Sequence, residues 1–128
     1  MLADLGDRSK LKPFDEWRDI YDVLENVRQR PGMWVRNGSL RELSILLWGY
    51  HLALRVHGVN ERFDFDPATG PFAQWLGRTR GWSMSCGWAT VIEENAGEIL
   101  PLEVFFELLD EWRASVVAEQ PAVAEAGS

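Results

Sequence analysis

The feature that most constrains the fold is an apolar stripe with helical spacing between positions 102 and 116. Hydrophobic side chains recur there every three or four residues, and the charged residues between them fall largely on the other side of a helix. The members of the stripe are Leu102, Phe105, Phe106, Leu108, Leu109, Trp112 and Val116. A helix with one apolar face is stable only when that face is buried, so this segment predicts a helix packed on a core.

A second apolar pattern predicts a helix over residues 16–29, with Asp15 as its N-cap. Its hydrophobic positions are Ile20, Val23, Leu24 and Val27. The helix is expected to end at Arg30, because Pro31 disfavours the α conformation in the residue before it. Gly32 is expected to adopt the positive φ of a tight reversal.

A third helix is predicted from Leu40 to about His57, with Ser39 as its N-cap and Gly58 as its C-terminal stop. Its expected apolar face consists of Leu43, Leu46, Leu47, Tyr50, Ala53 and Leu54. Gly49 costs this helix about 1 kcal/mol relative to Ala. We therefore expect Gly49 to be there because another element packs closely against it.

The rest of the chain has weaker signals. A short helix is predicted over residues 72–76, with Pro71 in its first turn. Residues 59–71 are predicted to form an irregular connection. For 59–66 a short strand is the alternative, and 88–94 fit either a strand or a helical turn. The predicted fold is mainly α, a single compact domain of three longer and one or two short helices.

The predicted domain organisation has three parts. Residues 1–13 have mixed charges and no periodicity, which indicates a flexible N-terminal arm. Residues 14–117 are expected to form the helical domain. Residues 118–128, rich in Ala, Glu and Pro, are expected to be a disordered tail.

Composition limits the classes of partner. The 128 residues are 46% apolar, enough for a core, and the net charge of −7 repels nucleic acid and anionic membranes and attracts basic proteins. The alternative interpretation is that the negative charge serves only to keep the protein soluble. The single Cys86 excludes an internal disulfide and is most simply a buried hydrophobe in a reducing compartment. With no signal peptide and no membrane span expected, we predict a cytoplasmic protein.

No residue pattern supports catalysis, a metal site or a cofactor. His51 and His57 are six residues apart on one predicted helix, which places them about 240° apart, so they cannot share a metal ion. Neighbouring carboxylates such as Glu93 and Glu94 point in different directions and are typical of a solvated face. The glycines do not form a phosphate-binding loop. We therefore predict that the protein is not an enzyme.

The segment from Leu24 to Val35 resembles the start of the ATPase domain of gyrase B and its relatives, where a similar run ends in Arg-Pro-Gly-Met-Tyr-Ile-Gly. In that family the next helix provides a Glu that activates water and an Asn that binds magnesium. Residues 46–54 contain neither a carboxylate nor an amide. ATP binding is therefore not expected.

A longer stretch, roughly residues 15–113, resembles small bacterial proteins of poorly defined function that share an Arg-Pro-Gly-(Met/Leu)-Tyr-Leu-Gly motif. The corresponding pieces, in order, are Arg30-Pro31-Gly32-Met33-Trp34, Ser39-Leu40, Trp48-Gly49-Tyr50, Phe72 to Leu76, Gly87-Trp88-Ala89 and Phe105 to Glu111. The chain departs from the motif in Trp34, which replaces the Tyr, and in Arg36, which replaces the final Gly. The resemblance implies an immunity- or antitoxin-like partner of a bacterial toxin.

For the motif residues a structural role is the favoured interpretation. Arg30 would bond carbonyl groups at a helix end, Pro31 and Gly32 would form the turn, and Met33 and Trp34 would fill the core. Trp82 lies in a loop rich in Gly and Ser and is the aromatic residue that we most expect to be partly exposed.

Two functional hypotheses follow. In the first, the protein is a non-enzymatic module that captures a basic, toxin-like protein through charge and aromatic anchors. The candidate contact residues are Trp34, Trp82, Glu103, Glu107, Asp110 and Glu111. In the second, it is a scaffold or a small-molecule-binding protein with an aromatic-lined pocket.

Overall fold

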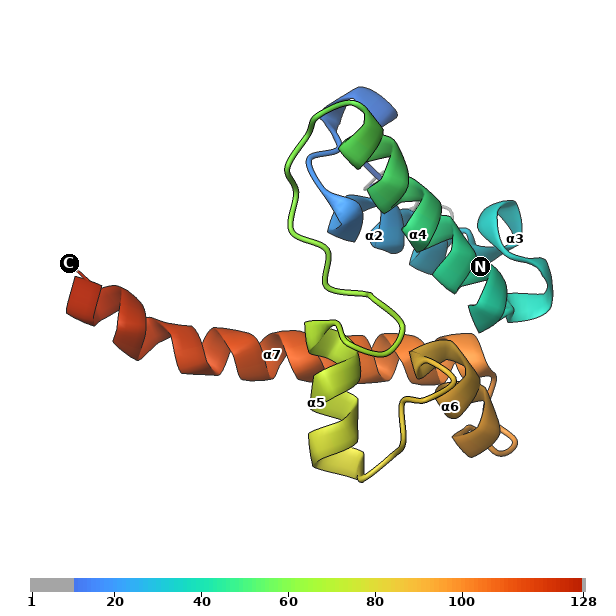
Figure 1. Ribbon diagram of the computed structural model, residues 1–128. Coiled ribbons are helices and arrows are strands. Elements are labelled where there is room, and N and C mark those ends of the chain that lie inside the picture. The colour runs from blue at the N-terminus through green and yellow to red at the C-terminus, as the bar shows by residue number, and fades with distance from the viewer. Residues whose placement is uncertain (1–10, 128) are drawn as a thin grey trace, which may run out of the picture. The chain divides into compact units, whose positions relative to one another are not determined.

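The computed structural model describes residues 11–127, with side chains up to Ala118, and this part is helical with no strand. The predicted mainly α class is therefore confirmed. The elements, in chain order, are η1 (Phe14–Glu16), α2 (Ile20–Gln29), α3 (Pro31–Trp34), η2 (Arg36–Gly38), α4 (Leu40–Val56), α5 (Pro71–Arg80), α6 (Trp88–Asn95) and α7 (Pro101–Gly127). Figure 1 shows the long irregular connection between α4 and α5.

The chain divides into two compact units, where one helical domain over residues 14–117 was predicted. Unit 1 is Met1–Arg62 and unit 2 is Phe63–Ser128. The boundary falls within the irregular connection between α4 and α5. The predicted arm over residues 1–13 lies outside the described residues except for its last three.

In unit 1 the first long helix begins later than predicted. The N-cap of α2 is Asp19, whose carboxylate accepts a hydrogen bond from the Tyr21 N–H at 3.0 Å, so the prediction of Asp15 was wrong. Asp15 lies instead in the single turn η1, which ends in extended backbone at Trp17. Both aspartates can cap a helix by residue type, but Asp19 is the one that directly precedes the helical backbone, where its carboxylate reaches the Tyr21 N–H.

The Pro-Gly pair ends one helix and starts another. Arg30 leaves the α conformation at φ −135° and ψ 61°, as the following proline predicts, but Pro31 is then the first residue of α3. Gly32 is helical, so its predicted positive φ was wrong. The left-handed residues are Asn37 at φ 53° and Gly38 at φ 67°, which reverse the chain before α4.

Both ends of α4 are as predicted. Ser39 accepts a hydrogen bond from the Glu42 N–H, and Gly58 at φ 73° ends the helix. Gly49, however, is exposed, and a Cβ built on it would meet nothing within 4 Å. The expectation of close packing at Gly49 was wrong for the described structure.

A partly buried polar contact joins the end of unit 1 to the start of α2. The Glu61 carboxylate accepts hydrogen bonds from the Tyr50 hydroxyl at 2.9 Å and from the Ile20 N–H at 3.1 Å. Burial of the Tyr50 hydroxyl, and then its hydrogen bond to Glu61, raise the pKa of Tyr50 above its usual range. The irregular residues after α4 are thus bonded back to α2.

Unit 2 is built around an aromatic cluster, which we define as Phe65, Phe72, Trp88, Phe105 and Trp112. The Phe65 ring lies 5.7–6.4 Å, between centroids, from each of the other four rings. The Trp88 Nε1–H donates to the Phe65 carbonyl at 3.0 Å. Phe65 comes from the irregular connection, so this segment is part of the core of unit 2 although it is not a helix or strand.

The three helices of unit 2 contribute the rest of its core. The helix predicted over residues 72–76 is the longer α5, with Pro71 in its first turn as expected. The ambiguous 88–94 segment is helical, as α6. Figure 1 shows α6 beside the first part of α7 and α5 crossing α7, whose later turns run on beyond both.

The last helix is longer than predicted. α7 continues to Gly127, through most of the segment 118–128 for which disorder was predicted. Alanine, glutamate and glutamine have high helix propensity, which supports the added turns.

Candidate functional site

The first part of α7 has one buried and one acidic face, as predicted. Its buried side chains include Leu102, Phe105, Phe106, Leu108, Leu109 and Trp112. The four candidate carboxylates, Glu103, Glu107, Asp110 and Glu111, are all exposed. Their spacing of three and four residues places them along one side of the helix, which we call the acidic face of α7. The structure therefore brings these four predicted residues together.

Glu111 of the acidic face is paired with a residue of another helix. Arg80 of α5 donates two hydrogen bonds to it, Nη1 to Oε1 at 3.2 Å and Nη2 to Oε2 at 2.9 Å. The guanidinium also lies 5.3 Å from the centre of the Trp75 ring. The hydrogen bond from Arg80 lowers the pKa of Glu111. Glu111 is thus better suited to hold α5 on α7 than to bind a partner.

Glu103 and Glu107 differ from Glu111 in their contacts with the rest of the protein. Among the residues that the structure describes, no hydrogen bond or ion pair engages either carboxylate, and both are exposed. They lie one helical turn apart, so they present two negative charges in the same direction.

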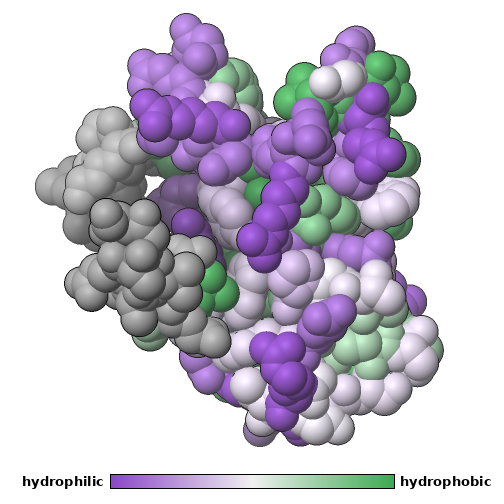
Figure 2. Space-filling view, turned by 60° about the vertical axis from the view of Figure 1, so that its left-hand side comes forward, coloured by the Kyte–Doolittle hydropathy of each residue, from purple (hydrophilic) through white to green (hydrophobic). Residues whose placement is uncertain are grey.

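The net charge of the chain is concentrated in unit 2. Residues 63–128 contain eleven Asp and Glu and three Arg, a net charge of −8, whereas residues 1–62 contain nine acidic and ten basic residues, a net charge of +1. Figure 2 shows hydrophilic and hydrophobic side chains side by side on one face of the surface. A basic partner is therefore attracted to unit 2 rather than to the chain as a whole.

Trp82 lies in the loop of unit 2 that connects α5 to α6, and its side chain is half-buried, which confirms the predicted partial exposure. Gly81 at φ 72° and Gly87 at φ 89° turn the backbone at the two ends of this loop. Cys86, in the same loop, is exposed, so its predicted burial was wrong. The residue occupies a connecting loop rather than a helix face, and periodicity cannot report the burial of a loop residue.

The Arg-Pro-Gly-Met-Trp motif is in unit 1 and is only partly buried. The prediction that Met33 fills the core was wrong, because its side chain is 62% exposed. Trp34 is half-buried and its Nε1–H donates to the Asn26 side chain at 2.9 Å. Because Pro31 starts a new helix, α3 turns Met33 outward. The Arg30 backbone N–H bonds the Asn26 carbonyl at 2.8 Å, but its side chain does not bond helix carbonyls as expected: Nη1 lies 3.9 Å from the Met33 sulfur, and the buried Nε has no hydrogen-bond partner among the described residues.

Two hollows lie beside α2, and the larger of them is lined by Arg30 and Met33 of this motif. The smaller, of about 100 Å³, lies among Leu11, Lys12, Trp17, Asp22, Glu25 and Asn26. The larger, of about 360 Å³, lies among Leu11, Lys12, Pro13, Phe14, Asn26, Arg30 and Met33. Each is lined by one aromatic ring, Trp17 or Phe14, together with polar and aliphatic groups.

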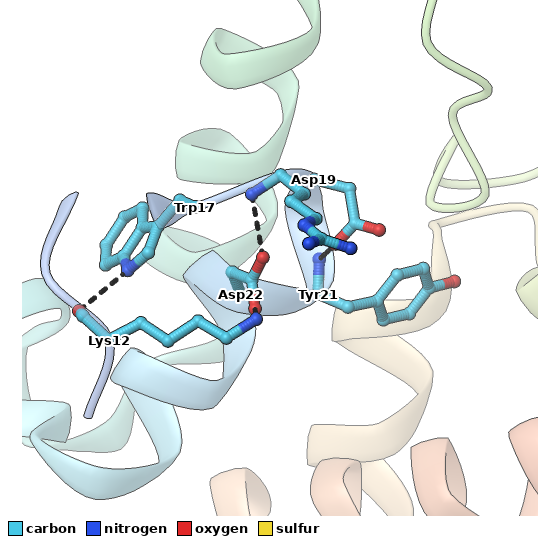
Figure 3. Close-up of polar contacts among 6 residues, drawn as sticks. Lys12, Trp17, Asp19, Tyr21 and Asp22 are labelled. Atoms are coloured by element: carbon cyan, nitrogen blue, oxygen red, sulfur yellow. Dashed lines mark hydrogen bonds and ion pairs between the residues drawn. The ribbon is translucent and has the colours of Figure 1, made fainter. Parts of the chain in front are cut away.

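Polar contacts hold the residues beside these hollows (Figure 3). The Asp22 carboxylate accepts the Arg18 N–H at 2.8 Å and pairs with Lys12 at 3.1 Å. The bond from Arg18, followed by those from Lys12, lowers the pKa of Asp22. The Trp17 Nε1–H donates to the Lys12 carbonyl at 3.1 Å, which holds the backbone at the mouth of the smaller hollow.

Sequence reasoning missed one group of exposed side chains, on α4. Trp48 is more exposed than Trp82, and Ile45, Leu52 and Val56 are also open to solvent. Their spacing of three and four residues was available in the sequence, but it was hidden because both sides of this helix are apolar.

No further chemistry is assembled in the described residues. Between Leu11 and Ala118, no three His, Cys, Asp or Glu side chains are grouped to hold a metal ion. None of the described helices has the length and apolarity needed to cross a membrane.

Comparisons with known proteins found no similar one: no protein-family model, curated protein or solved structure matches the chain significantly.

Proposed function

We propose that this protein is a non-enzymatic binding module that captures a basic partner protein through the acidic face of α7. The observation that supports it best is the pair of exposed carboxylates of Glu103 and Glu107, which no described residue pairs, in a unit with a net charge of −8. Complementary charge speeds association with a basic partner and discriminates against acidic ones. The sequence resemblance implies a particular form of this function, an immunity- or antitoxin-type inhibitor of a toxin.

The four carboxylates do not contribute equally under this proposal. Glu103, Glu107 and Asp110 would contact the partner, while Glu111 keeps α5 in place through Arg80. Trp82 is the candidate aromatic anchor in unit 2, because buried aromatic side chains supply much of the energy of protein interfaces. Trp34 belongs to unit 1 and already donates its N–H to Asn26, so we no longer include it in the contact set.

The proposal includes a cytoplasmic location and no cofactor, nucleic acid or membrane partner. Cys86 is an exposed thiol, and in a reducing compartment it stays free. The negative field of unit 2 would repel nucleic acid.

The test is a pull-down from the native host with the full chain as bait, at low and at high salt. We expect a basic protein at near one-to-one stoichiometry, whose association slows as salt rises because screening weakens the attraction. The double variant Glu103→Gln and Glu107→Gln should recover much less of that protein.

The matched control removes two exposed carboxylates from unit 1, Asp15→Asn and Glu16→Gln. Both double variants have the same net charge, so a specific site on α7 predicts a loss only for the first. Equal losses in the two variants would show that binding depends on net charge alone and not on a site on α7. If no basic protein is recovered, the capture proposal is refuted.

A second candidate function, the binding of a small molecule, is supported by the larger hollow of unit 1. Its volume of about 360 Å³ lies within the range of ligand sites, and the buried Arg30 Nε lacks a partner there. Lys12 and Arg30 make small carboxylates or phosphates the matching ligand class. A thermal-shift screen with such anions should show a rise in Tm that Arg30→Gln abolishes, and no rise in Tm would reject this function.

A further inference from the structure

Helix α4 has a second apolar face, opposite to the one that it buries. Leu40, Leu43 and Leu47 are buried, while four other hydrophobic side chains lie on the far side of the helix. They are Ile45, Trp48, Leu52 and Val56, exposed by 71%, 41%, 46% and 80%, and we call them the α4 stripe. Singly exposed hydrophobic residues need no explanation, but four along one helix face mark an interaction surface.

Small residues lie beside the α4 stripe. Gly49 and Ala53 are on the same side of the helix, both are exposed, and a Cβ on Gly49 would meet nothing within 4 Å. A glycine in mid-helix lowers helix stability, yet it allows another helix to approach the backbone closely. In the described part of unit 1 no other helix packs closely against Gly49, so the space beside it is open.

We infer that the α4 stripe is the interface of a homodimer, in which α4 packs antiparallel against α4 of a second copy. With the two-fold axis between positions 50 and 51, Gly49 faces Leu52 of the other copy, and Ala53 faces Trp48. Ile45 faces Val56. Each large side chain then meets a small or medium one, so the stripe is complementary to itself, as a two-fold interface requires.

The area of the stripe agrees with a dimer of modest affinity. The four exposures amount to roughly 500 Å² of apolar surface, at the upper end for the largest patch of a monomer. Two copies would cover about 1,000 Å² of apolar surface, with the flanking polar groups in addition, which reaches the size of a specific interface.

Charge also favours a second copy over the basic partner proposed above. Residues 43–54 of α4 contain no Asp, Glu, Lys or Arg, so the stripe cannot select a partner by charge. Unit 1 has a net charge of only +1, so two copies of it repel each other weakly. This inference goes beyond the proposed function, because the α4 stripe is in unit 1 and the acidic face of α7 is in unit 2.

The test is the molar mass of the full chain in solution, by light scattering and sedimentation, from about 1 to 200 µM, since small interfaces include many weak and transient ones. We expect the mass to rise with concentration from 14.6 kDa towards twice that value. Ile45→Glu and Val56→Glu should each raise the dissociation constant at least tenfold, because each would bury a charge. The matched control is Ile99→Glu, at a 53% exposed position of unit 2, which should leave dimerisation unchanged.

Gly49→Gln separates the dimer interface from a role in folding. At a concentration where the protein is monomeric, this substitution should raise the Tm, because glutamine favours a helix more than glycine does. It should also weaken the dimer, because its side chain would occupy the space of Leu52 from the other copy. A purely structural role for Gly49 would not give these opposite signs.

Three outcomes would overturn the inference. The chain could stay monomeric throughout the concentration range. It could dimerise with equal affinity in the stripe variants, which would place the interface elsewhere. Finally, Ile45→Glu could destabilise the monomer itself, which would mean that the chain covers its own stripe.

Discussion

Phe65→Ala should destabilise unit 2 more than any ordinary loop substitution. Phe65 lies in the irregular connection, yet its side chain is only 1% exposed and its ring contacts the other four rings of the aromatic cluster. Truncation of a buried phenylalanine costs about 3–5 kcal/mol, from lost transfer energy and the cavity that remains. The same residue on a solvated loop would cost less than about 0.5 kcal/mol.

The size of this effect follows from the size of the unit. A unit of about this length has a total stability of roughly 3–10 kcal/mol, so the substitution should remove a large part of it. At about 4–8 °C per kcal/mol, the Tm of unit 2 should fall by more than about 12 °C. Guanidinium unfolding followed by far-ultraviolet circular dichroism measures the free-energy change.

Phe63→Ala is the matched control, two residues away in the same segment. Phe63 is half-buried and its ring contacts Phe65 at 6.3 Å, so this variant should lose clearly less stability. If the two substitutions cost the same, or if Phe65→Ala costs below about 1 kcal/mol, the segment is not part of the core and the reasoning is wrong.

Three other predictions test separate parts of the chain. Gly70→Ala should destabilise unit 2 by about 1–3 kcal/mol in a denaturant titration, because its Cβ would lie 2.8 Å from the backbone of Asp64 and of Asp66. The control is Gly32→Ala, whose Cβ would meet nothing within 4 Å, so this variant should be near neutral. Hydrogen bonds lower the pKa of Asp22 below the usual value of an aspartate, so its stabilising effect is complete above that usual value and is lost as pH falls through the folded-state pKa. In Asp22→Asn the unfolding midpoint should therefore depend less on pH, between about pH 2 and 5, than it does in the parent protein. Magnesium-ATP should leave the Tm unchanged, and a rise of several degrees would show that the resemblance to the gyrase B segment is functional.

The helix ends that the sequence predicts well are those fixed by local chemistry. Ser39 and Gly58 bound α4 as expected, because a capping hydroxyl and a left-handed glycine act on the residues beside them. The start of α2 was predicted less well. Asp15 and Asp19 are both capping residues by type, and residue type alone does not select between them.

Side-chain burial, like the helix ends, was predicted well where the local sequence determines it and poorly where it does not. The core face of α7 was predicted because that helix has charges on its other side, so only one face can be buried. In α4 both faces are apolar, and periodicity cannot say which of them packs. The packing of Gly49 was therefore misjudged, and the exposure of Trp48 was missed. Within the candidate site, the exposure of Glu103 and Glu107 followed from the sequence. The pairing of Glu111 with Arg80 did not, because those residues are 31 positions apart.

The placement of the tryptophans gives the two units different optical properties. In unit 2, Trp75, Trp88 and Trp112 are buried, so they should emit at short wavelength, as indoles do in apolar surroundings. In unit 1, Trp17 and Trp34 are half-buried and Trp48 is exposed, so their emission should already lie further to the red. Loss of unit 2 would therefore shift the spectrum strongly and loss of unit 1 only slightly. The natural fluorescence of the unlabelled chain can thus show whether its halves unfold in one step or in two.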